Sequence, residues 1–174
     1  MKWQFVPEWQ KPTEAKFKPI NARDDKLDGG FYRQAFQCRR CLIPASFFYE
    51  WKRVVVDGKE EKQPYLIKIK NEDVFGMGGI YSIHKDADGT EHYFCAIVTT
   101  KPNDLMKPIH DRMPVIIHKD DYDTWLAGEI TDAKKLLKPF DSDQMEAWRV
   151  GSEVNSPRNN SKELTNPIDL AHIN

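Results

Sequence analysis

The sequence has no apolar run close to the roughly 18–20 residues that a membrane-spanning helix requires. Its start, Met1 to Gln10, has no basic region followed by an apolar stretch, so no secretory signal peptide is expected. Cysteine is scarce, and three cysteines without such a signal predict reduced thiols and a cytoplasmic location. There is also no internal repeat and no low-complexity segment. What is present, 174 residues with 40% hydrophobic and 30% charged side chains, predicts one globular domain with a real core.

Charge is nearly balanced over the whole chain, at −1, but it is unevenly distributed. Residues 1–53 carry eleven Lys and Arg against six Asp and Glu, whereas the remainder carries fifteen against twenty-one. A basic first third is expected of a protein with one face that meets a polyanion, and chance clustering of charges is the alternative.

Two β-hairpins are the clearest local signals, because each has Asp-Gly where a tight turn needs positive φ angles. The near-continuous apolar run at 93–98 predicts a strand that is buried on both faces. The predicted strand, turn and strand are 53–56, Asp57-Gly58 and 65–70 in the first hairpin, and 79–84, Asp88-Gly89 and 92–99 in the second.

Short helices are predicted later in the chain. Asp120 is expected to cap a helix that ends at Gly128, and Thr131 is expected to cap one over 132–137 that Pro139 stops.

The C-terminal part of the sequence predicts one more strand and an irregular tail, and with them the fold class. Residues 145–150 predict a further strand, and the Asn-, Ser- and Pro-rich stretch that follows predicts an irregular tail. We expect an α+β fold with a β-rich, barrel-like antiparallel sheet and a few short peripheral helices. The expected division is a domain over 1–155 and a tail over 156–174.

Glu50 is the first candidate for chemistry, because it lies among the aromatic residues of Phe47-Phe48-Tyr49-Glu50-Trp51. An apolar setting disfavours a charged carboxylate, which raises its pKa and suits it to general acid or base catalysis near neutral pH. The alternative is that Glu50 faces solvent on an alternating strand.

A second candidate is the His-Asp-Arg unit at His110, Asp111 and Arg112, which two prolines bracket. Histidine exchanges protons near pH 7, and arginine offers a two-pronged donor for phosphate or carboxylate. A structural turn is the alternative. A third, weaker candidate is Asn21 with Arg23. Asn21 supplies an amide that can donate and accept hydrogen bonds, and Arg23 supplies a second guanidinium that can bind an anion.

Cys38 and Cys41 form a C-x-x-C pair, but a zinc site would need two further ligands at comparable spacing. The five histidines are scattered and no second C-x-x-C pair exists, so no metal and no cofactor is expected. Cys95 lies in the predicted buried strand and is read as a small core residue.

These motifs occur in an order that resembles one family, the SRAP (SOS response-associated peptidase, or abasic-site-processing) family. The resemblance covers about residues 2–155, and four ordered motifs with the right residue types make chance agreement improbable. The stretches that carry it are 2–9, Ile20-Asn21-Ala22-Arg23, 40–51, 99–103, 109–114 and 148–155.

The resemblance implies a protein that binds single-stranded DNA and captures abasic sites covalently. In the family, a cysteine directly after the initiator Met attacks the sugar aldehyde through its α-amine, and its thiol then closes a thiazolidine ring. The same site is thought to remove the initiator Met autocatalytically, which explains the peptidase label. The implied partner is single-stranded DNA containing abasic sites, and a monomer without membrane or metal is expected.

The roles that the resemblance implies are specific to residues. Glu50 matches the catalytic glutamate, His110 the histidine that assists Schiff-base chemistry, and Asn21 the asparagine that holds the N-terminal residue. Arg23 and Arg112 match phosphate-binding arginines, and Trp9 matches an aromatic residue that stacks near the lesion.

The sequence departs from the family at its start, because residue 2 is lysine and the expected Met-Cys segment of about sixty residues is not seen. Three explanations are open: a longer native protein, a short form that binds DNA without crosslinking, or a partner piece encoded separately. A non-catalytic single-stranded DNA-binding module is therefore the alternative function, and a thiol or metal protein built on Cys38 and Cys41 is the third.

Overall fold

A computed structural model of the protein describes residues 1–168, and the chain forms two compact units. Each unit is built from three separate stretches of sequence, so neither is a contiguous domain, and the boundary at residue 155 stays a prediction. Unit 1 comprises Met1–Ala45, Phe75–Lys101 and Arg112–Phe140, and unit 2 comprises Ser46–Val74, Pro102–Asp111 and Asp141–Asn174.

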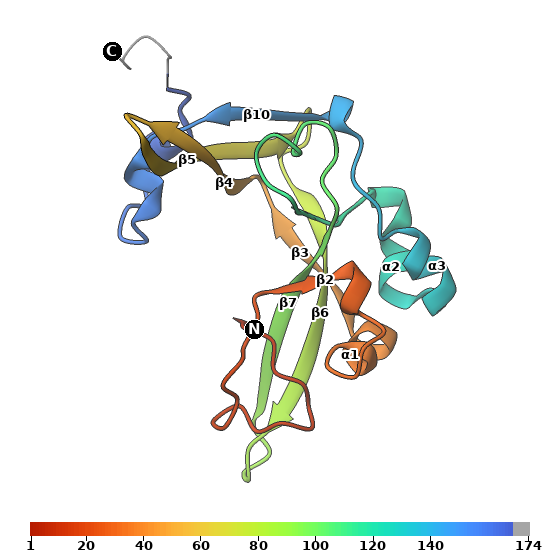
Figure 1. The fold of residues 1–174 in the computed structure, drawn as a ribbon. Helices are drawn as coiled ribbons and strands as arrows, with labels where there is room; N and C mark the ends of the chain where they lie inside the picture. The colour runs from red at the N-terminus through yellow and green to blue at the C-terminus, as the bar shows by residue number, and fades with distance from the viewer. Residues whose placement is uncertain (169–174) are drawn as a thin grey trace. The chain divides into compact units, whose positions relative to one another are not determined.

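Unit 1 is organised around a seven-stranded sheet in the order β1-β7-β6-β3, with β2 and β8 also paired to β7 and β9 to β6. Most pairings are antiparallel, but β1 and β2 run parallel to β7. Figure 1 shows the long strands β6 and β7 of this sheet. The strands are β1 (Lys2–Trp3), β2 (Asn21–Arg23), β3 (Arg40–Ala45), β6 (Phe75–Lys85), β7 (Glu91–Thr100), β8 (Met113–Pro114) and β9 (Ile116–Ile117).

The β6–β7 hairpin confirms the second predicted hairpin and extends it at both ends. Gly89 has a φ of +88°, as the turn signal required. Residues 94–100 are buried without interruption, which confirms the buried strand predicted at 93–98 except at Tyr93, whose side chain is exposed.

Three short helices belong to unit 1: α1 (Arg33–Cys38), α2 (Tyr122–Ala127) and α3 (Ile130–Lys135). The predicted caps are wrong. Asp120 lies inside a 3₁₀ turn, Lys119–Asp121, that precedes α2, and Thr131 lies within α3 because that helix already begins after Glu129. Gly128 does end α2. Helix α1 was not predicted because neither a capping side chain nor a helical period marks its six residues.

Arg40 connects the ends of two of these helices. Its buried guanidinium donates to the backbone oxygens of Phe36 and Gln37 at 3.0 and 3.1 Å, and to those of Trp125 and Gly128, both at 2.5 Å. The last carbonyls of a helix have no partner within the helix, so one arginine satisfies the ends of α1 and α2 together. The surrounding core consists of Phe5, Ala22, Leu27, Tyr32, Ala35, Phe36, Ile80, Ala96, Val98, Val115, Ile117, Trp125 and Ala133.

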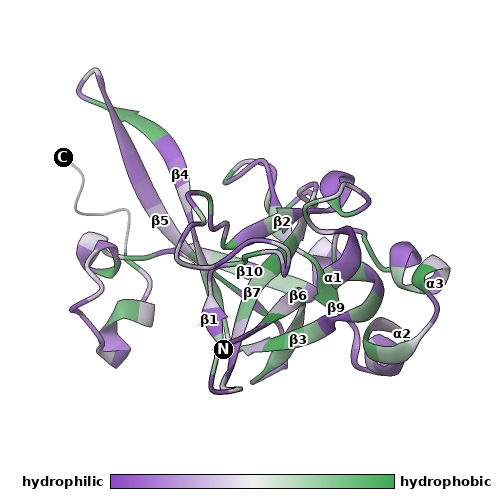
Figure 2. Cartoon of the chain, turned by 90° about the horizontal axis from the view of Figure 1, so that it is seen from below, coloured by the Kyte–Doolittle hydropathy of each residue, from purple (hydrophilic) through white to green (hydrophobic). Residues whose placement is uncertain are grey.

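Unit 2 contains a three-stranded antiparallel sheet in the order β10-β5-β4. Its strands are β4 (Phe48–Val56), β5 (Lys59–Ile69) and β10 (Met145–Arg149). Asp57 and Gly58 join β4 to β5 with φ angles of +50° and +74°, which confirms the predicted two-residue turn. In Figure 2 most of this hairpin is hydrophilic, while the end of β4 at Val54–Val56 is hydrophobic.

The stretch after β10 returns to the sheet of unit 2. Described residues 156–168 hold a 3₁₀ turn, Lys162–Thr165, and no strand or α-helix. Trp148 Nε1 donates to the oxygen of Thr165 at 2.9 Å, and the Tyr49 hydroxyl donates to that of Leu164 at 3.4 Å. The predicted tail is thus irregular where it is described but is tethered to strands β10 and β4, and its last six residues lie outside the described residues.

The predicted α+β, strand-rich class is confirmed, and the strands of residues 1–168 pair as two sheets without closing a ring. Within that same range, no helix has the length and apolar character to cross a membrane.

Candidate active site

Glu50 and His110 meet within unit 2, although sixty residues separate them in the sequence. Glu50 is the third residue of β4, and His110 is the last residue but one of the stretch Pro102–Asp111, where its backbone N–H donates to the oxygen of Met106 at 2.9 Å. Glu50 Oε2 and His110 Nε2 are 3.8 Å apart, and His110 Nδ1 is 3.4 Å from Asp111 Oδ1. The Glu50 side chain is 24% exposed, so it is partly buried but still reaches solvent.

Burial raises the pKa of Glu50 above its usual value. The nearby His110 and a hydrogen bond from the backbone N–H of Trp51 lower the pKa, Asp111 raises it further, and the net direction is upward. A carboxyl with a raised pKa holds its proton closer to neutral pH and can deliver it to a reacting atom. The pair therefore combines an acid of shifted pKa with a histidine in one place.

This pair lines an open cavity of about 430 Å³ within unit 2. Trp51 Nε1 donates to Asn155 Oδ1 at 2.7 Å, which fixes one wall. The lining residues are Glu50, Trp51, Arg53, Lys62, His110 and Asn155. Trp51, Arg53, Lys62 and Asn155 were not predicted as site residues, although Trp51 and Asn155 lie in the motifs that carry the resemblance.

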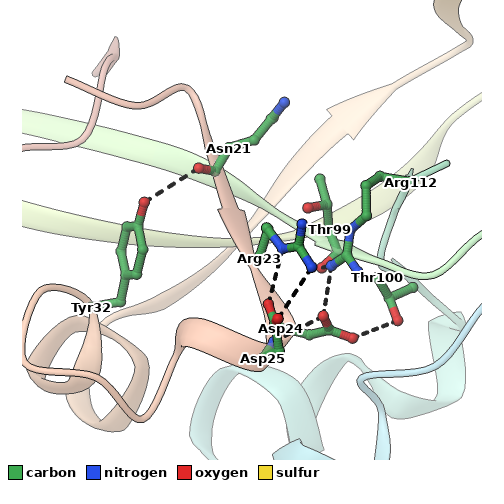
Figure 3. A network of polar contacts seen from close by, with 8 residues as sticks. All are labelled: Asn21, Arg23, Asp24, Asp25, Tyr32, Thr99, Thr100 and Arg112. Atoms are coloured by element: carbon green, nitrogen blue, oxygen red, sulfur yellow. Dashed lines mark hydrogen bonds and ion pairs between the residues drawn. The ribbon is translucent and has the colours of Figure 1, made fainter. Parts of the chain in front are cut away.

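Arg112 and Asp24 form the centre of a second polar network, which lies in unit 1 (Figure 3). Arg112 Nη2 donates to Asp24 Oδ1 at 2.6 Å and also to the backbone oxygen of Thr99. The Thr100 hydroxyl donates to Asp24 Oδ2 at 2.7 Å. The Arg112 side chain is only 17% exposed and its guanidinium is engaged within the protein, so its role in binding phosphate stays a prediction.

Asn21 and Arg23 lie on β2 beside this network, and Ala22 between them is buried. Arg23 donates through Nε and Nη2 to the two carboxylate oxygens of Asp25 at 3.0 and 3.1 Å. Asn21 accepts a hydrogen bond from the Tyr32 hydroxyl through its backbone oxygen at 3.4 Å, while its side chain points away from Arg23 (Figure 3). Both predicted residues are thus exposed on β2, whereas the neighbouring Arg112 side chain is largely buried.

The Asp24 carboxylate has a lowered pKa. Burial alone would raise it, but hydrogen bonds from Arg112 and Thr100 and the charge of Arg112 outweigh that effect. The stabilisation that Asp24 supplies is therefore present above its unfolded pKa, near 3.9, and is lost as the pH falls through the lower folded value.

Replacing Asp24 with Asn should lower the free energy of unfolding at pH 7 by about 1–3 kcal/mol, because two charge-assisted hydrogen bonds are weakened. The difference from the wild type should shrink toward pH 2, measured by urea denaturation across pH. Asp25→Asn is the matched control, since its pair with Arg23 is exposed and should matter little. An Asp24→Asn effect that persists in acid would contradict this account.

Trp9 also belongs to unit 1 but does not join the arginine network. It is 67% exposed, and its ring contacts Phe31 edge-on with centroids 6.3 Å apart. Phe17 is 63% exposed and packs on the same ring at 5.7 Å. The predicted stacking role of Trp9 stays a prediction, and Phe17 is an exposed aromatic neighbour that sequence analysis did not single out.

The three cysteines are not paired in the described part of the chain, and Cys95 is buried as predicted. Burial raises the pKa of the Cys41 thiol to about 12, so this thiol stays protonated at neutral pH and is a poor metal ligand. Residues 1–168 contain no cluster of three or more His, Cys, Asp or Glu side chains suited to a metal ion.

Comparison with known proteins identifies one family over nearly the whole chain. The sequence model of the SOS response associated peptidase (SRAP) family matches residues 1–157. The abasic site processing protein YoqW of Bacillus subtilis (strain 168) is 43% identical over 168 residues, covering 94% of this chain and 74% of that protein. The abasic site processing protein HMCES of Xenopus tropicalis is 31% identical, covering 98% of this chain and 57% of that protein.

Solved structures agree with these sequence matches. A protein from Bacteroides thetaiotaomicron superposes with a TM-score of 0.84 at 29% identity, covering 95% of this chain and 75% of that one. A phage-related protein from Bordetella bronchiseptica superposes with a TM-score of 0.69 at 26% identity, covering 87% and 70%.

Proposed function

Because the chain belongs to the SOS response associated peptidase (SRAP) family, we propose that it processes abasic sites in single-stranded DNA. The observation that carries the proposal is the Glu50–His110 pair, 3.8 Å apart in an open cavity, with the pKa of Glu50 raised. The printed names of the relatives, abasic site processing proteins, supply the substrate class.

The proposed reaction starts at the C1′ aldehyde of the ring-opened abasic sugar. A primary amine adds to the aldehyde carbon to give a carbinolamine, which then loses water to form a Schiff base. Loss of that hydroxyl needs a proton, and Glu50 in its protonated form donates it. His110 exchanges the proton that the amine releases, because an imidazole side chain can both accept and donate a proton.

We further propose that the amine belongs to a cysteine that follows the initiator Met and becomes N-terminal after the protein removes that Met autocatalytically. The cysteine thiol then adds to the Schiff-base carbon, and its proton passes to the nitrogen, which closes a thiazolidine ring. The printed sequence has Lys2 after Met1, so this chemistry is assigned to a protein that carries a family-type N-terminal extension. Asn21 is proposed to hold the N-terminal residue through its exposed side-chain amide.

DNA binding is proposed to involve Arg23, Arg112 and Trp9. The ion pair between Arg23 and Asp25 is exposed, so a DNA phosphate can replace the Asp25 carboxylate at the Arg23 guanidinium without leaving a buried charge unpaired. Trp9 presents an exposed ring on which an unpaired base can stack. We propose that the protein acts as a monomer in the cytoplasm, and its unpaired cysteines fit a reducing compartment.

The test incubates two proteins with a labelled single-stranded oligonucleotide that carries one abasic site. One protein is the chain as printed, and the other carries a family-type N-terminal extension that begins Met-Cys-Gly-Arg. A DNA–protein band that survives denaturation is expected for the extended protein, and it should be lost in Asn21→Ala.

An oligonucleotide with a tetrahydrofuran analogue is the control, because it lacks the aldehyde and should give no band. If the extended protein gives no band with the true abasic site, the crosslinking proposal is wrong. If both proteins bind DNA but neither forms the band, the alternative of a non-catalytic single-stranded DNA-binding module gains the support.

A further inference from the structure

Arg53 and Lys62 stand directly opposite each other in the β4–β5 pairing of unit 2. Like charges at directly opposed positions destabilise an antiparallel pair, so this arrangement has a cost in stability that a neutral residue would avoid. Neither residue is a predicted site residue. Both line the cavity that contains Glu50 and His110.

Neither cation is held by a strong internal partner. Arg53 Nη1 is 3.1 Å from Glu60 Oε1, but both side chains are exposed, at 76% and 61%, and exposed ion pairs are weak. Lys62 makes no ion pair within residues 1–168. Two neighbouring cations thus lie on one rim of the cavity, and within the described residues only the exposed ion pair to Glu60 neutralises them. Such a pair of positive charges favours the binding of an anion.

We propose that Arg53 and Lys62 together bind one backbone phosphate of single-stranded DNA at the rim of the Glu50–His110 cavity. Arginine supplies a two-pronged donor that matches phosphate oxygens, and lysine supplies a compact second charge. The bound phosphate offsets the repulsion between the Arg53 and Lys62 side chains. It also displaces the Glu60 carboxylate from the Arg53 guanidinium. This inference rests on the proposed function for the identity of the anion, and it assigns to the cavity a phosphate contact that holds the strand beside the acid–base pair.

The first experiment measures equilibrium binding of the full chain to a single-stranded oligonucleotide with a tetrahydrofuran site, by fluorescence anisotropy between 50 and 200 mM salt. Lys62→Gln and Arg53→Gln should each weaken binding by about 3- to 10-fold at low salt, and each should reduce the slope of log K against log salt by about 0.7. Lys59→Gln, on the same hairpin but outside the cavity lining, removes the same charge and should change neither quantity by as much.

A second pair of variants is expected to change the affinity for DNA in the opposite direction. Glu60→Gln removes the competitor from Arg53 and should tighten binding, whereas Glu61→Gln changes the net charge equally at the neighbouring position. A gain that is larger for Glu60→Gln than for Glu61→Gln supports displacement of Glu60 by phosphate. Equal gains would show only a general charge effect and would overturn the local site.

The outcomes separate this inference from the proposed function, because binding is measured for each variant and abasic-site processing for the same variant with the N-terminal extension that begins Met-Cys-Gly-Arg. Processing by the extended protein, with Lys62→Gln and Arg53→Gln indistinguishable from Lys59→Gln in binding, overturns the phosphate site alone. Specific loss of binding without any abasic-dependent product overturns the processing function alone. Absence of DNA binding by the wild type overturns both.

Discussion

In the protein that carries the Met-Cys-Gly-Arg extension, Glu50→Gln is expected to slow abasic-site processing by roughly 10²–10⁴-fold, the usual contribution of a positioned acid or base. Gln keeps the size and hydrogen-bonding capacity of the side chain but cannot release a proton. The wild-type pH–rate curve should have a limb above the ordinary Glu pKa of about 4.3, because burial raises the pKa of Glu50, and the variant should lack that limb.

The same substitution should stabilise the protein at neutral pH. Since the folded pKa of Glu50 is raised above its unfolded value, its favourable contribution is present below the unfolded pKa and is lost as the pH rises through the folded pKa. Gln does not titrate, so the unfolding midpoint of Glu50→Gln should exceed that of the wild type at pH 7–8 and approach it near pH 4.

Single-turnover crosslinking rates and thermal unfolding across pH 4–8 would check both effects. Glu61→Gln serves as the matched control, because Glu61 is exposed on the same hairpin and loses the same charge. Full activity in Glu50→Gln would remove this carboxyl from the mechanism, and a lower unfolding midpoint at neutral pH would contradict the raised pKa.

Arg40→Met should produce a large loss of stability. The variant leaves four backbone oxygens without their charged donor at the ends of α1 and α2. Hydrogen bonds from charged groups contribute about 1.5–3 kcal/mol each, so we expect a loss of at least about 3 kcal/mol in the free energy of unfolding. For a chain of this length that corresponds to a fall of about 6–12 °C in the unfolding midpoint.

Urea denaturation of three proteins would test this expectation. Arg40→Lys should fall between the wild type and Arg40→Met, because an ammonium reaches fewer of the four oxygens. Arg33→Met, on the exposed face of α1, is the control and should stay close to the wild type. If Arg40→Met were as stable as Arg33→Met, the hydrogen bonds of Arg40 would make no net contribution to the free energy of unfolding.

The arginine at position 40 illustrates a limit of sequence analysis. It lies in a motif that carries the family resemblance, yet nothing in the string of letters distinguishes a buried arginine that caps helices from an exposed one. The distinction comes from oxygens at Trp125 and Gly128, more than eighty residues away. Arg112 shows the same limit from the other side. It was predicted to bind a phosphate, and in the tertiary structure its guanidinium donates to Asp24, eighty-eight residues away.

The sequence by itself determined the features that depend on neighbours along the chain. Asp57-Gly58 predicted the turn between β4 and β5, the apolar run at 93–98 predicted buried β7, and ordered motifs predicted the family. Only the tertiary structure decided which polar residues meet: Glu50 with His110, Trp51 with Asn155, and Arg53 with Lys62 on one cavity. Turn preference and hydrophobic pattern are local properties of a few residues, whereas burial and pKa depend on side chains that only folding brings within a few ångströms.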